Sequence, residues 1–459
     1  MPAQHLTHPL DEASRARLEG RGLSMTLVDP AETDAWTGWL QAEARGFLGA
    51  APSAEHEREA RGYQADRRTT GVYGPAIAGA AGSTRPVATC QSWPTPLTVP
   101  GLGTPPAWAI SSVTVAPTHR RRGIATAMLT AELRTAATLG IPLAILTVSE
   151  STIYHRFGFG PASRLVGFEI ETKRERWRGR DAAGRLSYVD DPVAFRATGA
   201  AVLDRVRAGR VGEIGKSALL ADRLIGPLGS EPRRDEVRLV RFDDDAGRCQ
   251  GFVSYTLSAD AGGDAAMHGL EVRHLASATD DAYLALWRFL VEHDLVGRVR
   301  TTTAAEDEPL PHLLSDFRRA RQVAREDHLW LRVLDVPAAL EARRYERDGR
   351  IVLRVADPLG FAAGAFLLDV RGGAGTVEAL GPDDTVPGAR IPHATVPHAT
   401  VPHAGPVPEV RLDVTALGSL YLGGATARDA ALRGELSGDA AALDALFRTA
   451  RPPHLGSWF

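Results

Sequence analysis

Apolar residues in the first third of the chain change from an alternating pattern to a helical one. Val113 and Val115 alternate with polar neighbours, as in a strand that buries one face. A turn of arginines follows, after which Ile124, Met128 and Ala131 recur at the spacing of one helix face. The pattern predicts a strand that turns into a helix packed on a sheet.

A second strand is predicted shortly after this helix. Residues 143–148 are almost continuously apolar, as in a strand buried between two layers. Ser149 and Glu150 then supply side chains that cap helices, and Tyr154 lies in the helical turn predicted next. Because strands and helices alternate in this part of the chain, we predict an α/β fold.

The same order of strand, turn and helix returns in the middle of the chain. Residues 270–275 predict a strand, and residues 282–292 predict a helix. Asp280 and Asp281 stand at the start of this helix, where carboxylates cap the exposed N–H groups and repel phosphate. We therefore predict a second domain of the same layout that binds no phosphate.

The pattern changes once more near residue 333. Strands are predicted at residues 349–355 and 365–370, and a helix near residues 440–449, which is typical of a separate α+β domain. The sequence thus predicts a flexible, dispensable leader followed by three domains, with bounds at 1–23, 24–165, 166–332 and 333–459.

A tandem pentapeptide occupies residues 391–404 of the last domain. Its prolines favour an extended, exposed loop. His393, His398 and His403 recur within it and could in principle gather a metal ion, since imidazole is a common ligand. Expansion of a repeat within a loop explains the pattern more simply, so we predict no metal site.

Composition excludes several classes of protein. Hydrophobic residues make up 44% and charged residues 24% of the 459 residues, and the net charge is −3. These values fit a globular protein of two or three domains and give no reason to expect nucleic acid as a partner. Two distant cysteines, Cys90 and Cys249, exclude a disulfide framework and favour a reducing cytoplasm. We expect no membrane span, because no apolar run is long enough.

The turn before the first predicted helix is strongly basic. Arg120, Arg121 and Arg122 precede Gly123, which lets the backbone approach a ligand where a Cβ would obstruct it. The first N–H groups of a helix have no partner within the helix, and the helix dipole adds positive charge there. Such a turn alone is equally typical of a solvated loop. The helix and the buried strand that follow it favour a cradle for a pyrophosphate.

Two motifs resemble those of GCN5-related N-acetyltransferases (GNAT). The first is the spacing Arg120-x-x-Gly123-x-Ala125 after a strand. The second is Tyr154 followed at the family's distance by a Gly-aromatic pair that begins at Gly158. The resemblance implies that acetyl-CoA is the co-substrate, and that the turn and first helical residues, including Ile124, bind it.

One further motif is misleading. Residues 212–217 read Gly-Glu-Ile-Gly-Lys-Ser and end like a phosphate-binding P-loop. The first glycine of the full P-loop pattern would fall on Arg210, however, so we reject a nucleotide site there.

Segments along almost the whole chain resemble the enhanced intracellular survival (Eis) family of N-acetyltransferases. Several of them lie outside the generic acetyltransferase motifs, including residues 309–314, 329–332, 336–343 and 417–423. The resemblance implies two fused GNAT domains followed by a sterol-carrier-protein-like domain. It also implies assembly as a homo-hexamer.

The same resemblance implies roles for individual residues. Tyr154 would donate a proton to the departing thiolate of CoA. Chains of this family end in a phenylalanine whose terminal carboxylate reaches the first domain's active site, so Phe459 would be the base, although such a tail would otherwise be expected to fray. Backbone groups of Val113 and Val115 would orient the pantetheine and the acetyl carbonyl, Ser149 would contact acetyl-CoA, and no metal is required.

The chain departs from the family's pattern where aminoglycosides bind. Relatives that modify aminoglycosides carry acidic residues at positions that Gly46 and Trp458 occupy here. Glu43 and three glutamates at 55, 57 and 59 lie nearby in sequence and could compensate, although a glutamate run is more typical of a solvated helix face. Trp458 could instead offer an aromatic face to a cationic amine.

These observations support three hypotheses on function. The first is an acetyl-CoA-dependent N-acetyltransferase that modifies primary amines of small polyamine-like or aminoglycoside molecules. The second is acetylation of protein lysines by the same chemistry. The third is a lipid-binding or partner-binding protein whose acetyltransferase site is vestigial. We prefer the first, because the catalytic residues that the family uses are all present.

Overall fold

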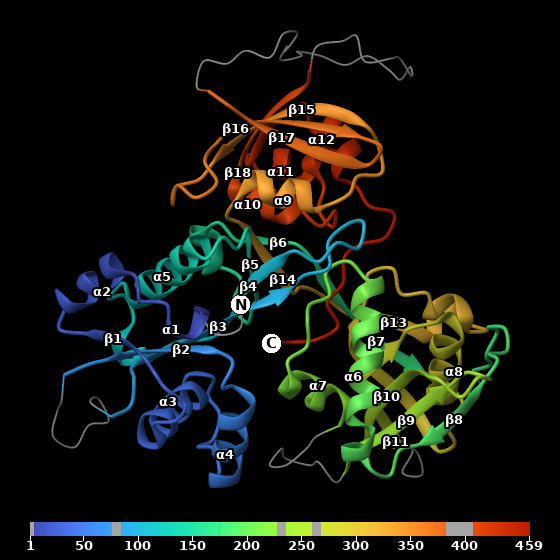
Figure 1. Cartoon of the computed structure of the whole chain (residues 1–459). Coiled ribbons are helices and arrows are strands. Elements are labelled where there is room, and N and C mark those ends of the chain that lie inside the picture. The colour runs from blue at the N-terminus through green and yellow to red at the C-terminus, as the bar shows by residue number, and fades with distance from the viewer. Residues whose placement is uncertain (1–3, 76–83, 174, 227–235, 259–267, 382–406) are drawn as a thin grey trace. The chain divides into compact units, whose positions relative to one another are not determined.

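The computed structural model describes residues 4–75, 84–173, 175–226, 236–258, 268–381 and 407–459 (Figure 1). These residues form two compact units. Unit 1 contains Met1–Pro52, Ala65–Ser163 and Asp327–Pro453, and unit 2 contains Ser53–Gln64, Arg164–Glu326 and His454–Phe459.

The first sheet of unit 1 has seven strands. In spatial order they are β1 (Ser24–Leu27), β2 (Arg68–Tyr73), β3 (Ala88–Pro96), β4 (Pro106–Val115), β5 (Leu143–Thr147), β14 (Leu329–Val333) and β6 (Gly160–Pro161). The strands β4 and β5 are parallel and are connected by helix α5 (Ile124–Thr138), as the sequence predicted.

Two helices cover opposite faces of this sheet. Val115 belongs to the core beneath α5, whereas the neighbouring Thr114 contacts Gly46 at the end of α3 (Thr33–Gly46). Because successive residues of a strand point to opposite faces, α5 and α3 must lie on different sides. Figure 1 shows α5 above the sheet and α3 below it.

The predicted leader is wrong for most of its length. Residues 4–19 contain two helices, α1 (Gln4–Thr7) and α2 (Glu12–Glu19), and are neither irregular nor exposed throughout. Asp11 caps α2 by accepting a hydrogen bond from the backbone N–H of Ser14 at 2.8 Å. Leu18 is fully buried in the core that α5 forms with the sheet, so removing the leader would open that core.

Strand β14 pairs with a sheet other than that of the domain in which the sequence placed it. We placed residues 329–332 in that domain, but β14 pairs antiparallel with β5 in the first sheet, with Leu329 opposite Thr147 and Val333 opposite Leu143. Local periodicity predicts a strand here and contains no information about which sheet receives it. The first sheet is therefore completed by residues from far along the chain.

Unit 2 is built around a second sheet of seven strands. Their spatial order is β13 (Ala320–Asp327), β7 (Arg164–Glu171), β12 (Val296–Ala304), β11 (His268–Ser277), β10 (Cys249–Ser258), β9 (Arg238–Asp243) and β8 (Arg185–Tyr188). The unit also contains α4 (Ala54–Tyr63), α6 (Pro192–Gly209), α7 (Ala218–Ile225), α8 (Asp280–Val291), η4 (Leu310–Leu313) and η5 (Phe317–Arg319). Helix α8 connects the parallel strands β11 and β12, which repeats the arrangement of β4, α5 and β5.

The third sheet belongs to unit 1. Its strands are, in spatial order, β17 (Ala374–Leu380), β16 (Gly364–Arg371), β15 (Gly349–Ala356), β18 (Glu409–Asp413) and β19 (Leu436–Gly438). Four helices accompany it: α9 (Val336–Ala342), α10 (Val414–Leu420), α11 (Ala427–Leu432) and α12 (Ala440–Phe447). This is the mixed α+β arrangement that the sequence predicted for residues after 333.

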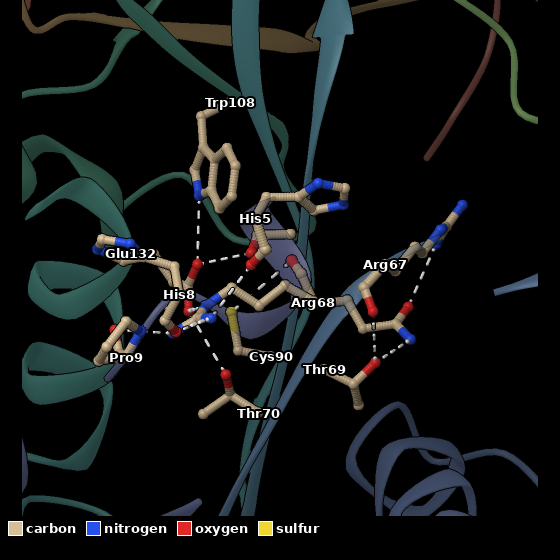
Figure 2. Close-up of polar contacts among 12 residues, drawn as sticks. His5, His8, Pro9, Arg67, Arg68, Thr69, Thr70, Cys90, Trp108 and Glu132 are labelled. Atoms are coloured by element: carbon tan, nitrogen blue, oxygen red, sulfur yellow. Dashed lines mark hydrogen bonds and ion pairs between the residues drawn. The ribbon is translucent and has the colours of Figure 1, made fainter. Parts of the chain in front are cut away.

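Helix α5 is fastened to the first sheet by a buried carboxylate, Glu132 (Figure 2). Glu132 accepts hydrogen bonds from Ser92 of β3 at 2.6 Å and from the indole N–H of Trp108 of β4 at 3.2 Å. Its Oε1 lies 3.7 Å from Nε of Arg68 on β2, and both side chains are almost completely buried. One carboxylate thus ties α5 to three adjacent strands.

Arg68 also holds the N-terminal segment. Its guanidinium donates hydrogen bonds to the backbone carbonyls of His5, His8 and Pro9, as Figure 2 shows. Burial lowers the pKa of Arg68, and Glu132 opposes that shift. Arg68, which pairs with the carboxylate that fixes α5, therefore also fixes the N-terminal residues that we had expected to be flexible.

We predict that Glu132→Gln lowers the free energy of unfolding by about 3–5 kcal/mol, because it leaves Arg68 buried without its counter-charge. Arg15→Ala is the matched control, since Arg15 forms exposed ion pairs with Glu12 and Glu19 and should cost less than about 1 kcal/mol. Urea unfolding of the three proteins measures both values. Equal stability of the wild type and Glu132→Gln would contradict the assignment.

Candidate active site

The strands β4 and β5 separate from each other halfway along their length. Their parallel pairing covers only Ala107–Ala109 opposite Leu143–Ile145, although β4 continues to Val115. From Ile110 onward, the edge of β4 that faces β5 has no ladder partner on that strand. Backbone N–H and C=O groups on such an edge can bind an extended ligand as a further strand would.

A β-bulge lies in β4 beside this opening. Thr89 of β3 is opposite Thr114 and Gln91 is opposite Ser111, so β4 has one residue more than β3 between these pairs. Ser112 adopts a positive φ of 53° within the bulge, and its carbonyl accepts a hydrogen bond from the Thr89 hydroxyl at 2.8 Å. The bulge changes the direction of the strand immediately before Val113.

The N-terminus of α5 lies after the end of β4 and is open. Gly123 is its N-cap, with a left-handed φ of 73°, and no side chain caps the helix. The first turn carries no acidic residue. Arg121 also has a positive φ, 61°, a strained conformation for a residue with a Cβ. The first N–H groups of α5 therefore keep their capacity to bind an anion.

Arg21, which the sequence analysis missed, supports this turn. It follows α2, and its guanidinium donates a hydrogen bond to the backbone carbonyl of Arg122. A Cβ added at Gly123 would lie 2.9 Å from Nη1 of Arg21, the mobile end of that side chain, so it is the left-handed φ of 73° that favours glycine there. Local sequence could not reveal the contact, because it joins the predicted leader to a turn about a hundred residues later.

The electrostatic field at the turn is positive. The side chains of Arg120, Arg121 and Arg122 are exposed, and within the described residues none of them forms an ion pair. Burial lowers the pKa of His119, and the charges of Arg122 and Arg45 lower it further. Uncapped amides, a glycine and several cations together fit a pyrophosphate.

Tyr154 belongs to the same hydrophobic core as the residues of β4 and β5 beside the point where these strands separate. It begins the short helix η2 (Tyr154–Phe157) and packs with residues of β4, β5 and α5, including Ile110, Leu146 and Ile124. Burial raises the pKa of Tyr154 to about 12, with smaller contributions from Cys90 and Glu150. The phenol therefore keeps its proton at neutral pH and can act only as a donor there.

The glycines after Tyr154 permit close packing. Gly158 has a φ of 80°, and a Cβ there would lie 2.0 Å from Nη1 of Arg332 on β14. Arg332 is completely buried and pairs with Asp357 at 2.7 Å, so it cannot move away cheaply. A Cβ at Gly160 would lie 2.1 Å from the carbonyl oxygen of Thr415 on α10. The Tyr-x-x-x-Gly motif thus marks where η2 meets the last third of the chain.

Helix α3 approaches the bulge from the opposite face of the sheet. A Cβ at Gly46 would lie 2.4 Å from Cβ of Thr114, so this helix could not approach so closely with any larger residue. One turn earlier, Glu43 accepts a hydrogen bond from the Ser112 hydroxyl at 3.2 Å. The carboxylate that is missing at position 46 is therefore present at position 43, on the same helix and beside the same strand. Glu55, Glu57 and Glu59 lie on α4 in unit 2.

The predicted site residues do not all lie together in the structure. Val113, Val115, Ile124 and Tyr154 share the core of unit 1, and Ala125 follows Ile124 in the first turn of α5. Ser149 is exposed in the loop after β5. Phe459 is half-buried and belongs to unit 2 together with the rest of its tail.

Helix α8, which occupies the place of α5 in the second domain, begins differently. The hydroxyl of Thr279 caps α8 by accepting a hydrogen bond from the N–H of Ala282 at 3.2 Å, and Asp280 and Asp281 occupy the first turn. A capped, acidic helix start does not attract phosphate. The absence of a phosphate site in the second domain stays a prediction.

Metal-binding clusters and membrane-spanning helices are both absent from the described ranges. No group of three or more His, Cys, Asp or Glu side chains there could hold a metal ion. The histidines of the pentapeptide, at 393, 398 and 403, lie outside the described residues. No described helix is both long enough and apolar enough to cross a membrane.

Comparison with known families assigns most of the chain. Residues 28–162 and residues 227–333 each match an acetyltransferase (GNAT) domain, and residues 336–456 match a sterol carrier protein domain. These matches confirm the predicted fold class of two acetyltransferase domains followed by a sterol-carrier-protein-like domain.

Individual relatives agree with this assignment. An uncharacterized N-acetyltransferase of Streptomyces avermitilis is 35% identical, over 90% of this chain and 94% of that protein. The N-acetyltransferase Eis of Mycobacterium tuberculosis is 34% identical, over 71% of this chain and 73% of that protein. The crystal structure of Eis1 from Mycobacterium abscessus superposes with a TM-score of 0.73 at 27% identity and covers 95% of this chain and 100% of that one. The chain therefore belongs to the Eis family and is an N-acetyltransferase of the GNAT type.

Proposed function

We propose that this enzyme transfers the acetyl group of acetyl-CoA to primary amines of small polyamine-like or aminoglycoside molecules. The observation that carries the proposal is the uncapped, glycine-led start of α5 beside the strand β4, which has lost its pairing with β5. This combination offers one site for a pyrophosphate and an adjacent backbone edge for an extended thioester arm.

Each part of acetyl-CoA has a proposed partner. The first amides of α5, at Ile124 and Ala125, bind the pyrophosphate together with the turn from Arg120 to Gly123. The free edge of β4 binds the pantetheine, and the backbone at Val113 and Val115 orients the arm and the acetyl carbonyl. Ser149, in the loop after β5, contacts the acetyl end.

The chemistry needs a base and an acid. A primary amine is protonated at neutral pH and must lose a proton before its lone pair attacks the thioester carbonyl. The terminal carboxylate of Phe459 accepts that proton, directly or through a water molecule. As the C–N bond forms, the C–S bond breaks and the sulfur leaves with its electron pair. The Tyr154 hydroxyl donates its proton to that sulfur.

The high pKa of Tyr154 defines how it acts. A phenol with a pKa of about 12 is a weaker acid than a thiol, whose usual pKa is about 8.5. Tyr154 therefore stabilises the sulfur mainly through a hydrogen bond from a group that is always protonated. If the transfer goes to completion, the second proton, which the nitrogen loses after the C–N bond forms, restores the phenol.

The acceptor is a cation before it reacts, so it needs an anionic partner. Glu43 is held at the bulge of β4 by Ser112, and we assign it the role that an acidic residue at position 46 has in relatives. A charge-assisted hydrogen bond of this kind contributes on the order of 1–2 kcal/mol. Trp458 offers an aromatic face in place of a second carboxylate, which favours smaller or less charged amines than aminoglycosides.

A buried cation lies in the domain that the lipid-binding hypothesis concerns. Arg343 is completely buried beside the third sheet, where its guanidinium donates to the carbonyls of Tyr421 and Phe447 and faces the rings of Tyr345, Tyr421 and Phe447 at 4.7, 5.9 and 4.5 Å. An apolar ligand would pack poorly directly against this guanidinium. Acetylation of protein lysines stays the alternative that only substrate tests can separate.

Two further expectations, one from the family and one from the cysteines, belong to this proposal. One is assembly as a homo-hexamer. The other is action in the reducing cytoplasm, with which the two buried free cysteines agree.

The first test is release of CoA from acetyl-CoA with polyamines, aminoglycosides and lysine peptides. We expect small primary amines to react and lysine peptides to react poorly. A panel in which no small amine releases CoA would contradict the proposal, and efficient reaction of peptides alone would favour the lysine hypothesis.

Adding one glycine after Phe459 tests the base. The extension moves the carboxylate by one residue, so we predict that kcat falls by about a hundredfold, the typical effect of losing a general base. Binding of acetyl-CoA should not change, which calorimetry checks as the control. Full turnover in the extended chain would place the base inside the first domain.

Tyr154→Phe tests the acid. We predict a kcat lower by about 10²–10³-fold with unchanged acetyl-CoA binding. Because the pKa of Tyr154 is raised to about 12, the protonated form persists below that pH, so wild-type kcat should show no alkaline fall up to pH 10. Tyr188→Phe, at an exposed position in unit 2, is the control and should be silent. A wild-type alkaline fall that Tyr154→Phe abolishes would show that the pKa is much lower.

Glu43→Gln tests the acceptor site. We predict that KM for the amine rises by about tenfold, while KM for acetyl-CoA stays unchanged, because only the amine loses a charge-assisted bond. Glu32→Gln, at the exposed start of the same helix, is the matched control. Equal amine KM values for all three proteins would exclude Glu43 from the acceptor site.

A further inference from the structure

The segment that resembles the end of a P-loop contacts the C-terminal tail. Residues 212–217 connect α6 to α7, and residues 454–457 of the tail lie against them. The backbone N–H of His454 donates to the carbonyl of Val211 at 2.8 Å. Gly212 has a positive φ of 95°, and a Cβ there would lie 2.9 Å from both N and O of His454. Glycine is thus required at position 212 by the close approach of the tail.

Glu213 binds the tail's backbone. Its Oε1 accepts a hydrogen bond from the N–H of Gly456 at 2.8 Å. A Cβ at Gly456 would lie 3.3 Å from this same oxygen, so a larger residue would crowd the carboxylate. His274 of β11 lines the same contact, since its Cε1 would lie 3.6 Å from that Cβ. The tail is therefore recognised by its backbone at a position that only glycine fits easily.

Lys216 binds the tail's side chain and neutralises Glu213. Its Nζ forms an ion pair with Glu213 and donates to the Ser457 hydroxyl at 3.0 Å. The side chains of Lys216 and Glu213 are only 6% and 5% exposed. Ser457 and Leu455 are also buried, Leu455 completely. A buried ion pair that is hydrogen-bonded on both sides is a rigid attachment and not a surface contact.

The charges of this cluster are settled at neutral pH. Burial alone would raise the pKa of Glu213, but Lys216 and His454 lower it to about 2. Burial lowers the pKa of His274 to about 4, and Lys216 contributes to that shift. Glu213 is therefore a carboxylate and His274 is neutral throughout the range in which an amine could be acetylated.

We propose that Glu213 and Lys216 are positioning residues that hold the C-terminal tail so that the carboxylate of Phe459 has a fixed place. The proposal rests on the role of Phe459 as the base. We name residues 212–217 the tail socket. Trp458 and Phe459 follow Ser457 in the tail, and Trp458 is 48% exposed. Without the socket, ordering each tail residue would cost about 1–2 kcal/mol, and a base displaced by about 1 Å can slow a reaction about a hundredfold.

The main variants are Lys216→Met and the double variant Glu213→Gln with Lys216→Met. The double variant removes both charges at once, so it leaves no buried ion unpaired and protects the test against simple unfolding. Lys173→Met, at an exposed position of unit 2, is the matched control, since Lys173 is the chain's other lysine. Circular dichroism on heating selects the variants that fold.

Two readouts separate the socket from the base. Amide hydrogen exchange of residues 454–457 reports the tail without any assay, and we expect it to become about tenfold faster in the socket variants. For turnover we expect kcat to fall by about a hundredfold with KM for acetyl-CoA unchanged. In a chain that lacks Phe459, the same variants should cause no further loss, because they act only through that residue.

Each outcome decides one point. Unchanged tail exchange in a folded socket variant would overturn the socket itself. Suppose that deletion of Phe459 inactivates the enzyme. Faster tail exchange in the socket variants together with an unchanged kcat would then overturn the positioning role of the socket. If Phe459 deletion leaves turnover intact, the proposed base is wrong and the positioning role falls with it, although exchange would still report the attachment. Faster exchange, reduced kcat and no additional loss without Phe459 would support the proposal.

Discussion

The buried carboxylate of Glu132 is the constraint on which the first domain depends. It accepts hydrogen bonds from Ser92 and Trp108 and pairs with Arg68, and so it fixes α5 across three strands. A helix fixed in this way also has a fixed N-terminus, and Gly123 opens that terminus beside the unpaired part of β4. The same arginine orders the N-terminal segment, from which Arg21 reaches the turn. The core and the proposed CoA site are therefore parts of one arrangement.

A few residues at the start of one helix distinguish the domain with the proposed CoA site from the second acetyltransferase domain. Both contain a helix between parallel strands. In the first domain the helix begins at a glycine in a left-handed conformation with arginines around it, whereas in the second it begins at a threonine cap with two aspartates. Capping satisfies the amides that would bind a phosphate, and the aspartates repel it. The second domain instead attaches the C-terminal tail through Glu213 and Lys216.

Local sequence patterns predicted what depends on local physics. The strand before Gly123, the helix after it and the acidic start of α8 follow from periodicity and capping, and the family resemblance was confirmed. The patterns could not predict that β14 joins the first sheet, that residues 4–19 are helical and packed, or that Gly212 contacts His454. Each of these depends on residues distant in the chain. Gly46 is a similar case. The family's pattern indicated that an acidic residue is missing at this position, whereas the structure shows why nothing larger than glycine fits against Thr114. The domain bounds and the roles of Tyr154, Ser149 and Phe459 stay predictions.

The central claim is that one CoA site exists, at the start of α5 and along the free edge of β4. Amide hydrogen exchange of the whole protein with and without CoA tests it most directly, because it needs neither an acceptor nor a catalytic step. The account predicts slower exchange at residues 110–116 and 120–126 when CoA is present, and no change at residues 277–284 around the start of α8. Protection at the start of α8, or none at the start of α5, would contradict the account.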